Sequence, residues 1–185
     1  VQLLLAMHWQ GRGIPGNAQE ALERAARLAP YDPAVAAQLG SVYAELGDLP
    51  AAAAAYRLAA ELAPDEPRFW RLLAEFSLSY HYDLESLGKA AARNALALDP
   101  REARSWAALG QIHLLQEQMI LAQRCLHQAI LLDPLDAEIQ LRYGMLQQAL
   151  GELQAARAAL ELASRLDPQG MKGTLAGRLL DALFP

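Results

Sequence analysis

The residues of this chain that could carry out chemistry are one cysteine and four histidines. Cys125 and His127 lie two positions apart on an expected helix, so their side chains point in different directions and make a poor metal pair. His8, His81 and His113 are scattered, and none belongs to a motif that joins a nucleophile, a base and an orienting group. We therefore predict no catalytic residue, no metal site, no cofactor and no enzymatic activity.

Two short stretches offer other functional readings. Gly11-Arg12-Gly13 is too short for a phosphate-binding loop, and no suitable strand accompanies it. Tyr80 and Tyr82 could form a binding edge, or they could cover a lengthened pair of helices. We favour the second interpretation.

Composition limits the class of protein. The 185 residues are 54% hydrophobic but only 6% aromatic, which suits tightly packed helices. The net charge of −5 argues against general nucleic-acid binding. The opening apolar run, VQLLLAM, is shorter than a membrane span and has no basic residue before it, so we expect neither a signal peptide nor an anchor. A cytoplasmic location is favoured, and the start inside an expected helix suggests a segment of a longer protein.

Five prolines recur at a nearly constant interval, and each closes a similar phrase such as RLAP, ALDP or LLDP. The intervals are 34, 36, 34 and 34 residues between Pro30, Pro64, Pro100, Pro134 and Pro168. A fixed period of this length predicts a repeat array. We expect repeats over 1–32, 33–66, 67–102, 103–136 and 137–170, with a C-terminal capping helix over 171–185.

Each repeat contains two apolar runs at helical spacing. The clearest example has Trp106, Leu109, Gly110 and His113 in the first run and Ala122, Leu126, Ala129 and Ile130 in the second. Such a helical hairpin has an apolar face on both helices and too little bulk to bury them alone, so it must pack against its neighbours. The third repeat has two extra residues near Tyr80–Asp83, which predicts a longer first helix or a bulged loop.

Small residues mark where the two helices of a hairpin approach each other. Glycine in mid-helix costs about 1 kcal/mol relative to alanine, so its recurrence needs a packing reason. We expect Gly110 to face Ala122 across a close helix crossing, and the same pairing recurs as Gly40 with Ala52 and Gly144 with Ala156.

These residues together resemble the tetratricopeptide repeat. The fourth repeat matches that pattern with Trp106, Leu109-Gly110, His113 in place of tyrosine, Ala122, Leu126, Ala129 and Pro134. The resemblance implies an all-α, right-handed α-solenoid of five helical hairpins plus the capping helix. It also implies that the first helices line a concave groove that binds an extended peptide or a partner's helix.

The groove positions supply the candidate ligand-binding residues. They are Arg68, Arg71, Glu75, Arg104, Gln111, Leu115, Arg142 and Met145. Glu138 precedes Arg142 by four residues and can pair with it, whereas the other three arginines have no obvious partner in the sequence. We therefore expect a protein or peptide partner with acidic residues beside apolar ones. The chaperone-tail specificity known from one branch of the family is not expected, because its two asparagines are missing and Glu138 replaces a cation.

Three functions stay open at this point. The first is a protein-interaction scaffold, the second is a substrate-recruiting repeat region of a larger enzyme, and the third is a self-association module that makes a homo-oligomer. Self-association would use the apolar first repeat or the edge formed by Leu179, Leu180, Leu183 and Phe184. Nucleic acid and membrane are not expected partners.

Overall fold

The computed structural model describes residues 2–184, and these residues form helices and turns without any strand. The chain divides after Asp99 into two compact units, which we describe one at a time. None of the helices in the described part is long and apolar enough to cross a membrane.

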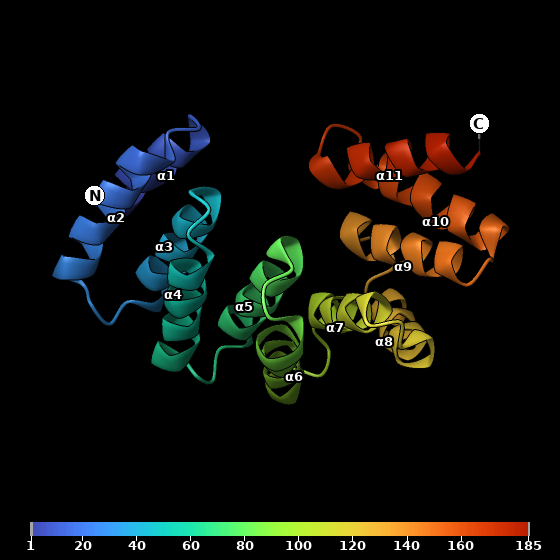
Figure 1. Cartoon of the computed structure of the whole chain (residues 1–185), viewed down its shortest axis with the longest axis horizontal. Coiled ribbons are helices and arrows are strands. Elements are labelled where there is room, and N and C mark those ends of the chain that lie inside the picture. Colours follow the sequence, from blue (N-terminus) through green and yellow to red (C-terminus); the bar gives the residue numbers. More distant parts are fainter. Residues whose placement is uncertain (1, 185) are drawn as a thin grey trace. The chain divides into compact units, whose positions relative to one another are not determined.

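The first unit consists of three helical hairpins (Figure 1). The helices are α1 (Gln2–Gly11), α2 (Pro15–Leu28), α3 (Pro33–Glu45), α4 (Leu49–Leu62), α5 (Pro67–Tyr80) and α6 (Lys89–Leu98), with a π-helical turn, η1 (Leu84–Gly88), before α6. Small residues fill its core: Ala6, Ala18, Ala21 and Leu22 pack with Val42 of the next hairpin. Each hairpin therefore completes its core with its neighbour.

The second unit repeats this arrangement with two hairpins and a final helix. They are α7 (Ala103–Leu115) with α8 (Met119–Leu132), α9 (Ala137–Ala149) with α10 (Leu153–Leu166), and α11 (Met171–Leu183). Leu126 of α8 is fully buried with Ile139 and Leu146 of α9, while Leu160 of α10 packs with Ala176 of α11. The predicted all-helical repeat architecture is confirmed within each unit.

The small residues of the first helices do allow close crossings, but the nearest side chain is not the predicted alanine. The backbone oxygen of Ala156 does lie 3.4 Å from the Cβ position of Gly144, as that predicted pairing requires. A Cβ atom added to Gly110 would lie 2.7 Å from Leu126 Cγ and 3.2 Å from Cys125 Cβ. The nearest side chains therefore lie about one turn beyond Ala122. Gly40 meets the Tyr56 ring and Gly144 meets Leu160 in the same way. Glycine is required at these positions because the side chain that meets it on the second helix, Tyr56, Leu126 or Leu160, is large and leaves no room for a Cβ atom.

A hydrogen bond across the connection ties each of three hairpins to the proline that ends the previous repeat. The indole Nε1 of Trp70 donates to the carbonyl oxygen of Pro64, and that of Trp106 to Pro100, both at 2.9 Å. In the last repeat Gln140 donates to the carbonyl oxygen of Pro134 at 2.7 Å. The residue in this position of the first helix, tryptophan or glutamine, therefore packs against its neighbours and also ties the helix to the connection that precedes it.

The two extra residues of the third repeat are divided between its helices. One lengthens α5 to 14 residues, against 13 in α3. The other is taken up by η1, where the Gly88 N–H donates to the Asp83 carbonyl oxygen five residues before it. A single inserted residue is commonly absorbed in this way as a wide turn. The predicted longer first helix is confirmed. The second extra residue lies in the π-helical turn η1 rather than in a bulged loop.

The turn inside every hairpin contains a residue with positive φ. In three hairpins it is Gly13, Gly47 or Gly151, and in the fourth hairpin it is Glu117 (φ 59°). The third hairpin has two such residues, His81 (φ 51°) and Asp83 (φ 46°). Residues with a side chain are strained in this left-handed conformation.

We predict that Gly110→Leu destabilises the protein by about 1 to 3 kcal/mol or more, because the new side chain would overlap Leu126 and Cys125. Gly16→Leu is the matched control, since a Cβ atom there meets nothing within 4 Å. Thermal unfolding followed by circular dichroism measures both. Equal melting temperatures for the two variants would show that the crossing is not tight.

We predict that Glu117→Gly stabilises the protein by about 0.5 to 1 kcal/mol, because it relieves the left-handed strain and loses only part of that gain to the greater freedom of the unfolded chain. Glu117→Ala removes the same charge but keeps the strain, and should not stabilise. A higher melting temperature for the alanine variant than for the glycine variant would contradict this account.

Candidate functional site

The eight candidate residues fall on two separate faces. Arg68, Arg71 and Glu75 lie on α5 of the first unit. The remaining five lie on α7 and α9 of the second unit, and we call them the α7–α9 face: Arg104, Gln111, Leu115, Arg142 and Met145. The structure brings candidates together within each unit, and each face is considered by itself.

The α5 residues are not free to meet a ligand as the sequence suggested. Arg71 Nη1 donates to Glu75 Oε1 at 3.0 Å, so Arg71 has a partner that was not obvious from the sequence. The guanidinium of Arg68 lies 4.4 Å from the centre of the Phe69 ring. The spacing of four residues between Arg71 and Glu75 could have indicated this ion pair from the sequence. It was a weak indication because the arginine precedes the glutamate, which is the less favourable order for a pair on a helix.

A second polar group on this unit was not foreseen. Gln10 Nε2 of α1 donates to Glu45 Oε1 of α3 at 3.0 Å, and the Tyr56 hydroxyl of α4 hydrogen bonds with Ser41. Burial is the largest cause that raises the pKa of Tyr56, to about 12, so the hydroxyl stays protonated. No local spacing could reveal partners that lie on different helices.

The tyrosines after α5 pack against its apolar side. Phe76 is the centre of the group, with ring centroids at 5.3 Å from Tyr56, 5.6 Å from Tyr80 and 5.7 Å from Tyr82. Such tilted contacts between rings are favourable. The tyrosines cover the lengthened hairpin, which agrees with the favoured interpretation.

On the second unit, Arg104 joins two hairpins. Its Nε donates to Asp136 Oδ2 at 2.8 Å, a partner 32 residues away that was not obvious from the sequence. The Arg104 side chain is 52% exposed and that of Asp136 only 7%. Asp136 also caps α9 by accepting from the backbone N–H groups of Glu138 and Ile139. The carboxylate therefore stays in place, while the arginine remains accessible.

Glu138 is the centre of a partly buried ionic group. Its Oε1 accepts from Arg142 Nη2, as the spacing of four indicated, and also from Lys172 Nζ of α11 at 2.8 Å. Two cations, Arg142 and Lys172, share one oxygen of the Glu138 carboxylate. The formal charges of these three groups therefore add up to +1. Lys172 was missed because it lies 34 residues away, in the equivalent position one repeat later.

The two carboxylates are kept charged against the effect of burial. Burial raises the pKa of Asp136, but hydrogen bonds from Arg104 and from the α9 backbone outweigh it, so the pKa is below its usual value. Burial likewise raises the pKa of Glu138, but the charges of Arg142 and Lys172 and the Lys172 hydrogen bond lower it by more. Both groups therefore prefer the ionised form in the folded chain.

The remaining residues of the α7–α9 face combine apolar and polar character. Leu115 is 42% exposed, and Met145 is half-buried against the cluster that contains Leu141 and Leu160. Gln111 and Arg142, predicted to be surface residues, are both only 8% exposed. Gln111 Oε1 and Arg142 Nη1 are buried without a hydrogen-bond partner.

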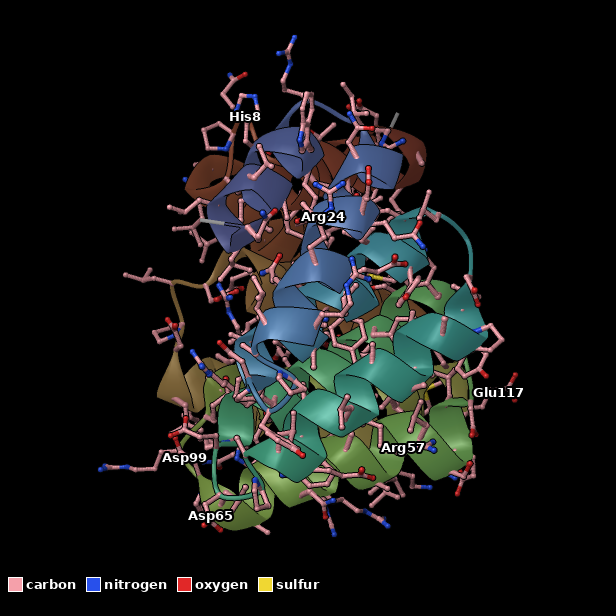
Figure 2. All side chains as sticks on the ribbon, turned by 90° about the vertical axis from the view of Figure 1, so that its left-hand side faces the viewer. His8, Arg24, Arg57, Asp65, Asp99 and Glu117 are labelled. Carbon is pink, nitrogen blue, oxygen red and sulfur yellow. The ribbon has the colours of Figure 1, made fainter. Side chains whose placement is uncertain are left out.

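The structure assembles no catalytic group from the cysteine and histidines. His113 is buried, with Nδ1 2.6 Å from Gln118 Oε1, and Cys125 is a buried thiol outside any disulfide. Among residues 2–184 no three His, Cys, Asp or Glu side chains are grouped to hold a metal ion. Figure 2 shows His8, Arg24 and Arg57 on separate helices of the first unit rather than gathered at one point.

Stacked helical hairpins with a mixed apolar and polar face define a helical-repeat protein. Sequence profiles described as tetratricopeptide repeat match residues 12–76, 103–134 and 121–170, which together make up most of the chain. The chain belongs to the tetratricopeptide repeat family. No curated protein matches it.

Solved structures share the fold. A thermophilic tetratricopeptide-repeat protein of Thermus thermophilus is 22% identical with a TM-score of 0.81, covering 100% of this chain and 98% of its own. The pilF protein of Pseudomonas aeruginosa is 19% identical with a TM-score of 0.73, covering 100% and 90%. PilW, a type IV pilus biogenesis factor, is 17% identical with a TM-score of 0.74, covering 100% and 92%. At these identities the likeness concerns the fold alone.

We predict that stability falls when the medium is acidified. Because the folded-state pKa values of Asp136 and Glu138 are lowered, their stabilising effect is complete above the unfolded values of about 4. It is lost as the pH falls through the lower folded values. The melting temperature between pH 7 and pH 2 should therefore fall less steeply in an Asp136→Asn, Glu138→Gln variant.

Asp65→Asn, which removes a charge from an exposed loop, is the control and should keep the wild-type slope. An unchanged slope in the double variant would mean that these two carboxylates do not couple folding to pH.

Proposed function

We propose that this protein is an interaction scaffold whose α7–α9 face binds a peptide or a partner's helix. The observation that supports this most directly is the combination on one face of an exposed Leu115, a half-buried Met145 and charged groups fixed by ion pairs. Apolar side chains of a partner would gain by contact with Leu115 and Met145, and the fixed polar groups would set orientation. Membership of a helical-repeat family agrees with such a role.

Acidic residues of the partner would bind at Arg104. The Arg104 side chain is 52% exposed, so a partner's carboxylate can approach its guanidinium although Nε is bound to Asp136. Arg142 is a poorer candidate for that purpose because it is only 8% exposed. On the α5 face, Arg68 is the exposed arginine and could take a similar part.

The extents of the five repeats and the role of the last helix belong to the same proposal. We assign α11 as a cap, because Thr174, Arg178 and Asp181 stand where α7 has Trp106, Gly110 and His113, and all three are exposed. A polar outer face of this kind would end a stack of hairpins in water.

Self-association is the second candidate function. It is favoured by the exposed apolar side chains of α1, where Leu4 is 70% and Met7 53% exposed. Light scattering over a range of protein concentrations would distinguish a monomer that binds a partner from a chain that binds itself. The substrate-recruiting alternative would use the same α7–α9 face within a longer protein.

We predict that peptides selected from a phage-displayed library of random 16-residue sequences bind the wild type more tightly than Arg104→Glu, by about fivefold to thirtyfold at low salt, because repulsion replaces a charge-assisted hydrogen bond. The difference should shrink with added salt, since exposed charges are screened within about 10 Å at 0.1 M. Fluorescence anisotropy measures the affinity.

Arg124→Glu makes the same charge change on an exposed residue of α8 and is the matched control. Equal loss in both variants would show that net charge, rather than the α7–α9 face, governs binding. Failure of the library to yield any binder would count against the scaffold proposal itself.

A further inference from the structure

A pocket lies between the first two hairpins of the first unit. Its volume is about 440 Å³, which is within the range of ligand pockets in proteins. The lining is apolar apart from one amide and one carboxylate, and it includes Gln2, Leu3, Ala25, Leu28, Asp32 and Val35. Leu28 is 79% exposed, so the pocket can be reached from solvent.

The same place one repeat later is filled by a phenyl ring. Val35 lies 34 residues before Phe69, so the two residues hold the same position at the start of α3 and of α5. Phe69 is only 3% exposed and packs in one cluster with the counterparts of the pocket residues, namely Ala36, Ala37, Ala59, Leu62 and Ala63. Gln2 and Leu3 are larger than their counterparts, yet the pocket beside Val35 stays open. A ring-sized apolar group is therefore what this place between two hairpins accommodates.

The carboxylate of the pocket has a counterpart that shows which group it binds. Asp32 is the N-cap of α3, as Asp136 is of α9. Asp32 Oδ1 accepts from the backbone N–H of Ala34 at 2.8 Å, so the cap holds the carboxylate in place. In Asp136, Oδ1 caps the helix and Oδ2 accepts from Arg104 Nε at 2.8 Å. No ion pair among residues 2–184 involves Asp32, which leaves its charge for a cation from outside.

We infer that this pocket is a second binding site of the protein, and that it takes an aromatic side chain of a partner polypeptide next to a basic residue of the same segment. The ring is buried against Leu3, Ala25 and Val35, and the neighbouring guanidinium or ammonium group pairs with Asp32. An acidic neighbour would be repelled by Asp32. The site does not depend on the α7–α9 face.

The test uses capped dipeptides as probes on the full chain, with shifts in the NMR spectrum of the protein as the measure of affinity. Acetyl-Phe-Arg-amide should bind about twofold to fivefold more tightly than acetyl-Phe-Gln-amide, because an exposed ion pair contributes no more than that. Acetyl-Phe-Glu-amide should bind more weakly than both. Acetyl-Ala-Arg-amide should bind about tenfold more weakly than acetyl-Phe-Arg-amide, since it has no ring to bury.

One variant tests the space for the ring. Val35→Phe fills the pocket from within, as Phe69 does one repeat later, and should weaken the binding of acetyl-Phe-Arg-amide by about tenfold or more. Leu58→Phe adds the same ring to an exposed position of α4 and is the matched control, which should leave the affinity unchanged.

A second variant tests the charge. Asp32→Asn keeps a side chain that caps α3 but removes the carboxylate, so it should abolish the preference for acetyl-Phe-Arg-amide over acetyl-Phe-Gln-amide. Asp48→Asn makes the same change at the N-cap of α4 and should keep the preference. The Asp32→Asn result decides by itself if Val35→Phe does not fold.

Equal binding of acetyl-Phe-Arg-amide by the wild type and by folded Val35→Phe would overturn the pocket, and a preference for arginine that survives in Asp32→Asn would overturn the role of the carboxylate. Tighter binding of free 2-phenylethylamine than of the dipeptide would assign the pocket to a small molecule instead of a partner polypeptide. Self-association that Val35→Phe abolishes in light scattering would assign it to a second copy of the chain. These results leave the proposed function of the α7–α9 face standing, because Arg104→Glu tests that face separately.

Discussion

The close approach of the two helices in a hairpin is the constraint on which the rest of this structure depends. Gly40, Gly110 and Gly144 bring the first helix against a large side chain of the second, namely Tyr56, Leu126 and Leu160. Leu126 and Leu160 are fully buried, and Tyr56 is partly buried. A helix pair held this closely still exposes apolar residues on its flanks. The next hairpin covers them, as Ile139 and Leu146 do over Leu126. The hairpins therefore stack because each close pair of helices leaves apolar side chains that only the next hairpin can cover.

Polar bonds then set how one hairpin follows another. Trp106 binds the carbonyl oxygen of Pro100, and Arg104 binds Asp136 at the start of the next hairpin. The link between Glu138 and Lys172 extends the same principle to the last helix. Because these bonds lie on or beside the first helices, they stiffen the face that the proposed partner would contact. A stiff face loses less conformational freedom when a ligand binds.

Ion pairs also change how the charges of the α5 face and of the α7–α9 face, each taken by itself, can be used. Four arginines would suggest a strongly basic surface if they were free. Arg71, Arg104 and Arg142 instead each hold a carboxylate, so their charge is largely compensated and their direction is fixed. Arg104 is the one of these three arginines whose side chain is more than half exposed, at 52%.

The sequence by itself determined the fold class, because a period near 34 residues and the positions of glycine, alanine and proline are local properties that dictate helix lengths and crossings. It also revealed the pair of Glu138 and Arg142, whose spacing of four places them on one helix face. Only the tertiary structure decided that Leu126 rather than Ala122 faces Gly110, and that Arg104 is paired with Asp136. It alone placed Gln111 and Arg142 below the surface with unpaired atoms. These outcomes depend on side chains that meet across different helices, and no spacing along the chain encodes which of them will lie within hydrogen-bonding distance.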